Sequence, residues 1–136
     1  MAGRVRHVRT LSSEALGALD GEVDLLFVDG AHRYGPARDD LLRWGARVRS
    51  GGVMLVHDAF SSIGVTLALL RGVVFGRDWR YRGRVGSLAE YERAPVRGRA
   101  RLVNASRQLG QLPWFARNLV LKGLIVARLR RGPWPY

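Results

Sequence analysis

Two acids and two histidines follow two apolar runs of the chain, in positions where their side chains can take part in chemistry. The first run ends at Asp29, with His32 three residues later, and the second ends at His57 and Asp58. A carboxylate pair can hold a hard divalent cation or position a substrate, and a histidine can accept a proton near neutral pH or bind a metal. We therefore take Asp29 and Asp58 as candidate metal ligands, and His32 and His57 as candidate catalytic bases or additional ligands.

Each of these residues also has a purely structural interpretation. His32 can be a loop residue that caps the next helix, and His57 a packing residue at a strand end. Asp29 can be a turn residue before Gly30, and Asp58 the N-cap of a helix. The two acids occupy matching positions after two similar runs, so the structural interpretations must hold at both positions at once. We therefore favour a shared chemical role.

The two apolar runs predict a pair of parallel strands. Residues 23–28 and 53–56 are both apolar runs, and the near-continuous hydrophobicity of residues 23–28 is typical of a strand covered on both faces. Between them, Pro36 suits the first turn of a helix with one apolar face, and residues 50–52, Ser-Gly-Gly, end that helix. A strand, helix and strand of this length form one right-handed crossover, so both strand ends meet at the same edge of a sheet.

Further elements follow from local patterns. Alternation over residues 4–9 predicts a strand with one solvated face, and two serines precede a short helical stretch at 14–19. The later segments are a helix at 63–74, a hairpin at 79–93, a charged linker at 95–101 and an amphipathic helix at 114–131.

The composition predicts one domain without disulfides and with an uneven charge. The chain has 136 residues and no cysteine. Residues 71–136 hold 15 Arg and Lys against 3 acids, which accounts for the whole net charge of +12. Such a surface can meet nucleic acid, anionic lipid or an acidic substrate, or it can be a solvated face of an arginine-rich protein. Neither a signal peptide nor a membrane span is found in the sequence, and we expect a cytoplasmic protein.

Several enzyme classes lose support because their motifs are missing from the sequence. It contains no GxxxxGK[ST] phosphate loop, no HExxH pair and no GxSxG elbow. Cofactor-assisted group transfer and simple binding remain.

Residues 24–34, 40–41 and 50–58 together resemble the second half of class I S-adenosylmethionine-dependent methyltransferases, and in particular the small-molecule group whose strand end reads DGxHxY. Residues 85–91 are similar to the terminal hairpin of that group. The resemblance covers roughly residues 4–93. It implies an α/β fold with a Rossmann-like doubly wound sheet, truncated here to strands 3 to 7, with residues 4–9 as the third strand.

This resemblance also implies a division of the chain. Residues 1–93 are a partial methyltransferase domain, from the third strand through the terminal hairpin. Residues 94–136 are a basic linker and a C-terminal amphipathic helix. That helix can pack on the core of the fold, bind a lipid interface or form a dimer.

The site is implied by the same resemblance. In metal-dependent relatives, acids at the ends of the fourth and fifth strands bind magnesium and orient a substrate hydroxyl, and Asp29 and Asp58 match them. His57 stands where some relatives carry a further acid, which argues against magnesium itself because magnesium prefers oxygen ligands. His32 matches the histidine of the DGxH pattern and is the candidate general base. The implied cofactors are S-adenosylmethionine and a divalent metal such as Mg²⁺.

The residues that bind the methyl donor in this family are not evident in the sequence. No glycine-rich turn of the family type precedes Val23, and no acid occurs in residues 1–13. We expect a truncated or remnant sequence, or a complementing chain, and a chain that is inactive alone. With the sheet starting at its third strand, residues 23–28 should be a poorly protected edge or an aggregation site.

The predicted function is thus O-directed methyl transfer to a small hydroxylated acceptor. A homo-oligomer or a complementing chain is a possible partner. The alternative is an inactive remnant, or a basic binding module for nucleic acid or an anionic membrane.

Overall fold

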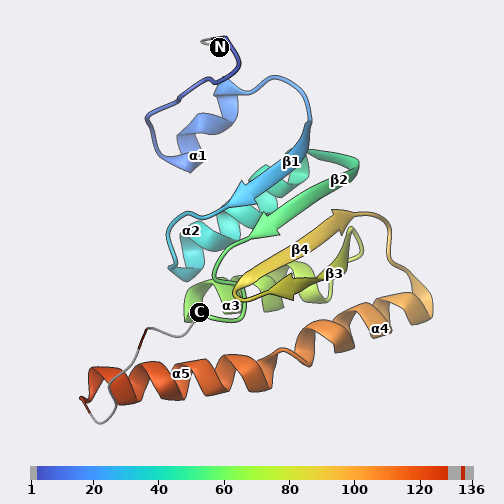
Figure 1. Cartoon of the computed structure of the whole chain (residues 1–136). Coiled ribbons are helices and arrows are strands. Elements are labelled where there is room, and N and C mark those ends of the chain that lie inside the picture. The colour runs from blue at the N-terminus through green and yellow to red at the C-terminus, as the bar shows by residue number, and fades with distance from the viewer. Residues whose placement is uncertain (1–2, 129–132, 134–136) are drawn as a thin grey trace.

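A four-stranded sheet with helices on one face forms the centre of the protein (Figure 1). The structure is a computed structural model, and it describes residues 3–128 and 133. The strands lie in the order β1 (Val23–Val28), β2 (Val48–Val56), β4 (Leu88–Arg93) and β3 (Trp79–Val85). Strands β1 and β2 are parallel, and β4 is antiparallel to both of its neighbours. This mixed α/β arrangement is consistent with a Rossmann-like methyltransferase fold, and it confirms the parallel pair and the hairpin.

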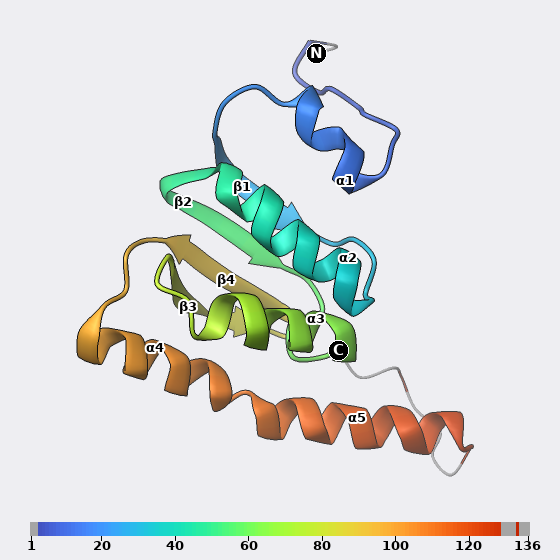
Figure 2. The same cartoon turned by 180° about the vertical axis from the view of Figure 1, so that it is seen from behind.

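Two helices cover one face of this sheet (Figure 2). Helix α2 (Tyr34–Asp39) continues through a π turn, Asp40–Trp44, and a 3₁₀ turn, Gly45–Arg47. Helix α3 (Ile63–Leu69) continues through a second π turn, Leu70–Val74, which confirms the predicted helix at 63–74.

The core lies between these helices and the sheet. Met54 and Val56 of β2, Ala89 and Tyr91 of β4 and Leu41 after α2 are all at most 1% exposed. Successive strand residues point to opposite faces, so their neighbours face away from the helices.

The second face of the sheet is open at β1. Leu25 and Phe27 keep 55% and 51% of their surface exposed. The expectation that this strand is covered on both faces is therefore wrong for the described residues, because α2 and α3 lie on the same side (Figures 1 and 2).

The outer edge of β3 is covered by helix α4 (Gly98–Leu109). The side-chain amide of Asn104 accepts a hydrogen bond from the Tyr81 N–H (2.8 Å) and donates one to the Trp79 carbonyl (3.0 Å). Arg107 donates to the carbonyls of Tyr81 and Arg82, both at 3.2 Å. Side chains of one helix therefore take the place of a fifth strand. Strand β1 is the other edge, and no described residue pairs with its outer side.

Two strand predictions need correction, one at residues 4–9 and one at the start of β2. Residues 4–9 form no strand, because the sheet ends at β1 and gives their alternating pattern no partner among the described residues. The short helix after them is present, as α1 (Ser12–Ala15) and a 3₁₀ turn, Leu16–Ala18. Strand β2 begins at Val48 rather than at Val53. Its register with β1 shifts at residues 49–52, where Gly51 has a φ of 74°.

The C-terminal part of the described chain is more helical than predicted. The segment 95–101 is not a linker throughout, because α4 begins at Gly98. Helix α5 (Leu112–Val126) follows α4 along the same side of the protein (Figure 1) and confirms the predicted final helix as far as Val126. The last predicted helical residues, 129–131, lie outside the described residues. Among the described helices, none is both long and apolar enough to cross a bilayer.

Candidate functional site

The end of β1 is joined to the end of β2 by the backbone. The N–H of His57 donates to the carbonyl of Val28 at 2.9 Å, as expected for parallel neighbours. Asp29 therefore begins one strand-end loop directly beside His57, which begins the other. The predicted meeting of the two strand ends at one edge of the sheet is confirmed.

The turn after β2 is tight and contains two residues in the left-handed region. Asp58 and Phe60 both have a φ of 55°, in the left-handed region. An aspartate adopts this region with little strain, but a phenylalanine rarely does. The Phe60 side chain is fully buried, and the N–H groups of Ser61 and Ser62 donate to the Asp58 carbonyl at 3.1 and 3.0 Å. Burial and these two hydrogen bonds therefore hold the turn that presents Asp58.

The loop after β1 is held against the start of α3. The Ser62 hydroxyl donates to the His32 carbonyl at 3.2 Å. A Cβ atom on Gly64 would lie 2.1 Å from the same carbonyl oxygen and 2.7 Å from the Tyr34 nitrogen. Only a glycine at position 64 permits this approach, which brings His32 to the turn that carries Asp58.

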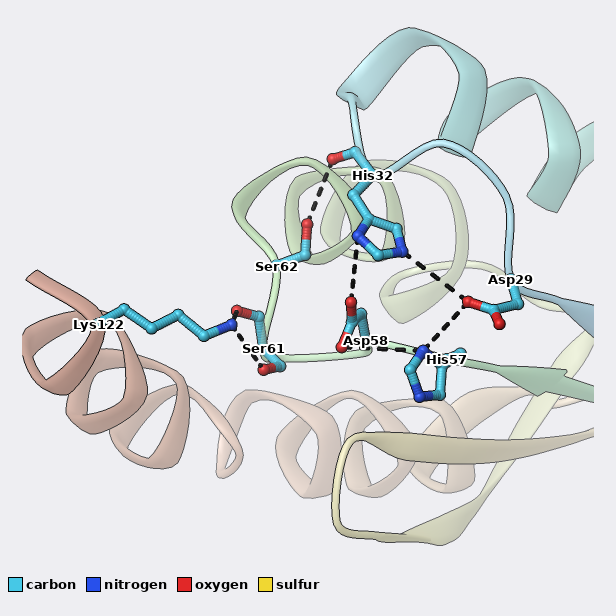
Figure 3. A network of polar contacts seen from close by, with 7 residues as sticks. All are labelled: Asp29, His32, His57, Asp58, Ser61, Ser62 and Lys122. Atoms are coloured by element: carbon cyan, nitrogen blue, oxygen red, sulfur yellow. Dashed lines mark hydrogen bonds and ion pairs between the residues drawn. The ribbon is translucent and has the colours of Figure 1, made fainter. Parts of the chain in front are cut away.

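The four predicted site residues meet in one network (Figure 3). Nδ1 of His32 lies 3.1 Å from Oδ2 of Asp58, and Nδ1 of His57 lies 3.1 Å from Oδ1 of Asp29. Two longer contacts cross between these pairs, from His32 to Asp29 at 3.9 Å and from His57 to Asp58 at 3.8 Å. The side chain of Asp58 is 15% exposed, whereas those of Asp29 and His32 are about half exposed, at 46% and 49%.

A metal fits part of this network. Asp29, His32 and His57 can each supply one ligand atom such that all three atoms lie within 4.8 Å of one another. Nδ1 of His57 is buried and makes no hydrogen bond of good geometry, although it lies 3.1 Å from the Asp29 carboxylate. A cation between these two atoms would satisfy both. The mixed nitrogen and oxygen set suits Zn²⁺, Mn²⁺ or Fe²⁺ better than Mg²⁺.

A hollow of about 430 Å³ is lined in part by Asp29. It lies along the outer side of β1, and its lining is mostly apolar. The residues that line it are Ser12, Leu26, Phe27, Val28, Asp29, Gly30, Asp40 and Trp44. A volume of this size is in the range of small-molecule binding sites.

Asp40 and Lys122 are site neighbours that the sequence did not reveal. Asp40 is buried, and a Cβ atom on Gly30 would lie 2.8 Å from its carboxylate. Lys122 of α5 donates to the carbonyl (3.0 Å) and the hydroxyl (3.2 Å) of Ser61. Asp40 lies four residues before Trp44, on the same side of the helix after β1, but no feature of the local sequence indicates that its side chain is buried. Lys122 is the only lysine of the chain, but this fact does not predict that it contacts Ser61.

The comparison with known families bears on this same region. Residues 1–59 match the family model of a methyltransferase domain. No curated protein matches the chain. The matched segment includes β1, α2 and β2, and it contains Asp29, His32, His57 and Asp58. The match therefore supports a methyltransferase domain, and such a domain suggests the use of S-adenosylmethionine in general.

Proposed function

We propose that the protein takes part in S-adenosylmethionine-dependent methyl transfer to a hydroxyl group of a small molecule. The observation that carries this proposal is the pairing of His32 with Asp58 at 3.1 Å, beside Asp29 and His57. The methyltransferase match over the same residues supports the reaction class.

His32 has the geometry of a general base held by a carboxylate. With a proton on Nδ1, the nitrogen that lies 3.1 Å from Asp58, the lone pair of a neutral imidazole would be on Nε2, the nitrogen on the Asp29 side. Nε2 would accept the proton of the acceptor hydroxyl while the oxygen attacks the methyl group. The new bond is oxygen to carbon, the broken bond is carbon to sulfur, and S-adenosylhomocysteine leaves. Asp58 fixes the orientation and tautomer of the ring and stabilises the imidazolium that forms.

Asp29 and His57 would hold a divalent cation. Such an ion supplies Lewis-acid polarisation and orientation of the acceptor oxygen. The hollow beside Asp29 would receive the rest of the acceptor, because its mainly apolar lining suits a ring or a short chain with one hydroxylated end.

We propose residues 1–93 as the methyltransferase part of the chain, with residues 94–136 in a separate role. We further propose that a complementing chain or a second copy shares the contacts to the methyl donor. The support is the outer edge of β1, which has no strand partner among the described residues and which borders the hollow.

Metal binding tests the site separately from turnover. Mn²⁺ titrated into the protein and followed by calorimetry should bind at one site, and Asp29→Asn should weaken binding about tenfold or more, since second-shell changes alone cost that much. Asp39→Asn is the matched control, because Asp39 is a similarly exposed acid, at 52%, on α2. His32→Asn should abolish methyl transfer to a panel of small alcohols and phenols, while Mn²⁺ binding persists.

The outcomes separate the assignments. Loss of Mn²⁺ binding in His32→Asn would make His32 a metal ligand rather than the base. Equal binding by the Asp29 and Asp39 variants would refute the metal site. If metal binds but no hydroxylated compound is methylated, even with S-adenosylmethionine in excess, the chain does not transfer methyl groups without the proposed complementing chain.

A further inference from the structure

The outward side of α5 is almost entirely apolar. Seven residues of this helix are exposed, and only one of them, Arg117, is polar; the others are Pro113, Ala116, Leu119, Val120, Gly123 and Val126. Val120 and Val126 expose 61% and 71% of their surface. The solvent side of a surface helix is normally its polar side, but α5 is apolar on its outward side as well as on the side that packs Trp114 and Phe115 against the core.

Contacts with the rest of the protein fix α5 in this orientation. Lys122 donates to Ser61 at the other side of the helix, and Asn118 is fully buried there. The guanidinium of Arg84 lies 3.7 Å from the centre of the Trp114 ring. The apolar side cannot turn inward without breaking these contacts.

Helix α4 extends the same combination of apolar and basic residues. Leu102 and Val103 expose 72% and 49% of their surface, next to the exposed Arg99. The sequence from 94 to 136 contains nine Arg and Lys residues and no acid. None of the arginines between 97 and 128 forms an ion pair with an acid in the described part of the chain.

We infer that this outer face of α4 and α5 binds an anionic lipid surface. The face is defined by its apolar residues Leu102, Val103, Ala116, Leu119, Val120 and Val126, and by Arg99, Arg117 and Arg128. An amphipathic helix in a lipid interface buries aliphatic side chains below the headgroups, while arginines contact the phosphates. No described helix can cross the bilayer, so the face lies on the membrane rather than in it.

Two other occupants fit the face less well. Nucleic acid is bound through phosphates and stacked aromatic residues, but α5 exposes no aromatic side chain among its described residues. A second copy of the same face would bring arginines against arginines, with no acid from residues 94–136 to compensate them. The lipid surface satisfies both the apolar and the basic residues.

Vesicle sedimentation with the full chain tests this inference. The protein should pellet with vesicles of phosphatidylglycerol and phosphatidylcholine, but only weakly with phosphatidylcholine alone. Val120→Asp should weaken binding about tenfold or more, because it removes one buried valine from the interface and adds a repelled charge. Val85→Asp is the matched control, because Val85 is 85% exposed at the end of β3, and it should bind like the unchanged protein.

A charge variant tests the basic part of the face. Arg117→Glu should reduce binding to the anionic vesicles, whereas Arg38→Glu on α2 should not. Circular dichroism checks that each variant is folded; because all four positions are exposed, each should be. The inference does not depend on methyl transfer, since it is read out by lipid binding alone.

Four results would overturn the inference. The first is no pelleting of the unchanged protein with the anionic vesicles. The second is pelleting that both Val120→Asp and Arg117→Glu leave unchanged. The third is a dimer in light scattering that Val120→Asp dissociates, without vesicle binding, which would assign the face to a second copy. Binding of DNA or RNA without vesicle binding would likewise assign it to nucleic acid.

Discussion

Nδ1 of His32 and Oδ2 of Asp58 lie 3.1 Å apart, although one residue follows β1 and the other follows β2. Their meeting depends on the Ser62 contact to His32, on Gly64 and on the left-handed backbone of Asp58. The proposed base and the acid proposed to orient it are therefore placed by two separate strand ends.

Asp58→Asn should uncouple His32 from its orienting acid without unfolding the turn. Asparagine tolerates the left-handed region as aspartate does, so the fold should persist. The loss of a carboxylate that fixes a catalytic histidine costs orders of magnitude in rate in comparable pairs, and we expect at least about a hundredfold loss of methyl transfer. The nitrogen-15 NMR signals of His32 should show one neutral tautomer in the unchanged protein and a mixture in the variant. Unchanged signals would contradict the pairing.

Gly64→Ala should destabilise the protein through the site. Its Cβ atom would overlap the His32 carbonyl oxygen at 2.1 Å, so the loop after β1 must move. Overpacking of this kind costs about 1–3 kcal/mol in the free energy of unfolding. Gly123→Ala is the control in α5, where a Cβ atom meets nothing within 4 Å, and it should stabilise by about 0.5–1 kcal/mol. Urea denaturation measures both, and equal effects would refute the close approach.

Leu25→Lys should reduce association through the edge of the sheet. Leu25 is half exposed on β1, whose outer edge is unpaired among the described residues, and a lysine on an edge strand disfavours pairing with another chain. Stability should change by no more than about 0.5 kcal/mol, as at other exposed positions. Light scattering against protein concentration reads the association. Val85→Lys is the control, and identical scattering of the two variants would exclude β1 as the associating edge.

Stability should fall at high pH because of the buried tyrosines. Burial raises the pKa of Tyr91 well above its ordinary value, with a smaller contribution from Tyr81, and burial also raises the pKa of Tyr81 against the opposing effect of Arg84 and Arg107. The unfolded chain then loses protons at a lower pH than the folded protein, so the free energy of unfolding decreases as pH rises above about 10.

Tyr91→Phe should reduce this loss. At neutral pH it should be neutral or slightly stabilising, because the Tyr91 hydroxyl is buried without a hydrogen-bond partner among the described residues. Denaturation at pH 7 and above pH 10 compares the two proteins. A variant that loses as much stability at high pH as the unchanged protein would contradict the role of Tyr91.

The sequence was sufficient to predict that the candidate residues lie together, because their positions follow from strand ends. Two apolar runs separated by one helix must be parallel neighbours, so Asp29 and His57 had to meet. The partner of each side chain was not predictable in the same way. The pairing of His32 with Asp58 depends on the close approach at Gly64, which is a contact between distant segments.

Elements that depend on distant contacts were missed. Helix α4 has a glycine at its first position and no side-chain cap, so its local signal is weak, and Asn104 and Arg107 hold it on the edge of β3. Residues 4–9 show the reverse case, since their alternation is strong but finds no strand to pair with in the described structure. A periodic pattern predicts which face of an element is apolar, but it does not predict which other element that face or edge will contact.

Ser61 connects the C-terminal helix α5 to the turn after β2. Its N–H is bonded to the Asp58 carbonyl, and its carbonyl and hydroxyl are bonded to Lys122 (Figure 3). Helix α5 is therefore connected to the turn that carries Asp58 through two successive hydrogen-bonded links. A displacement of α5 would therefore be transmitted to the backbone of the turn that carries Asp58.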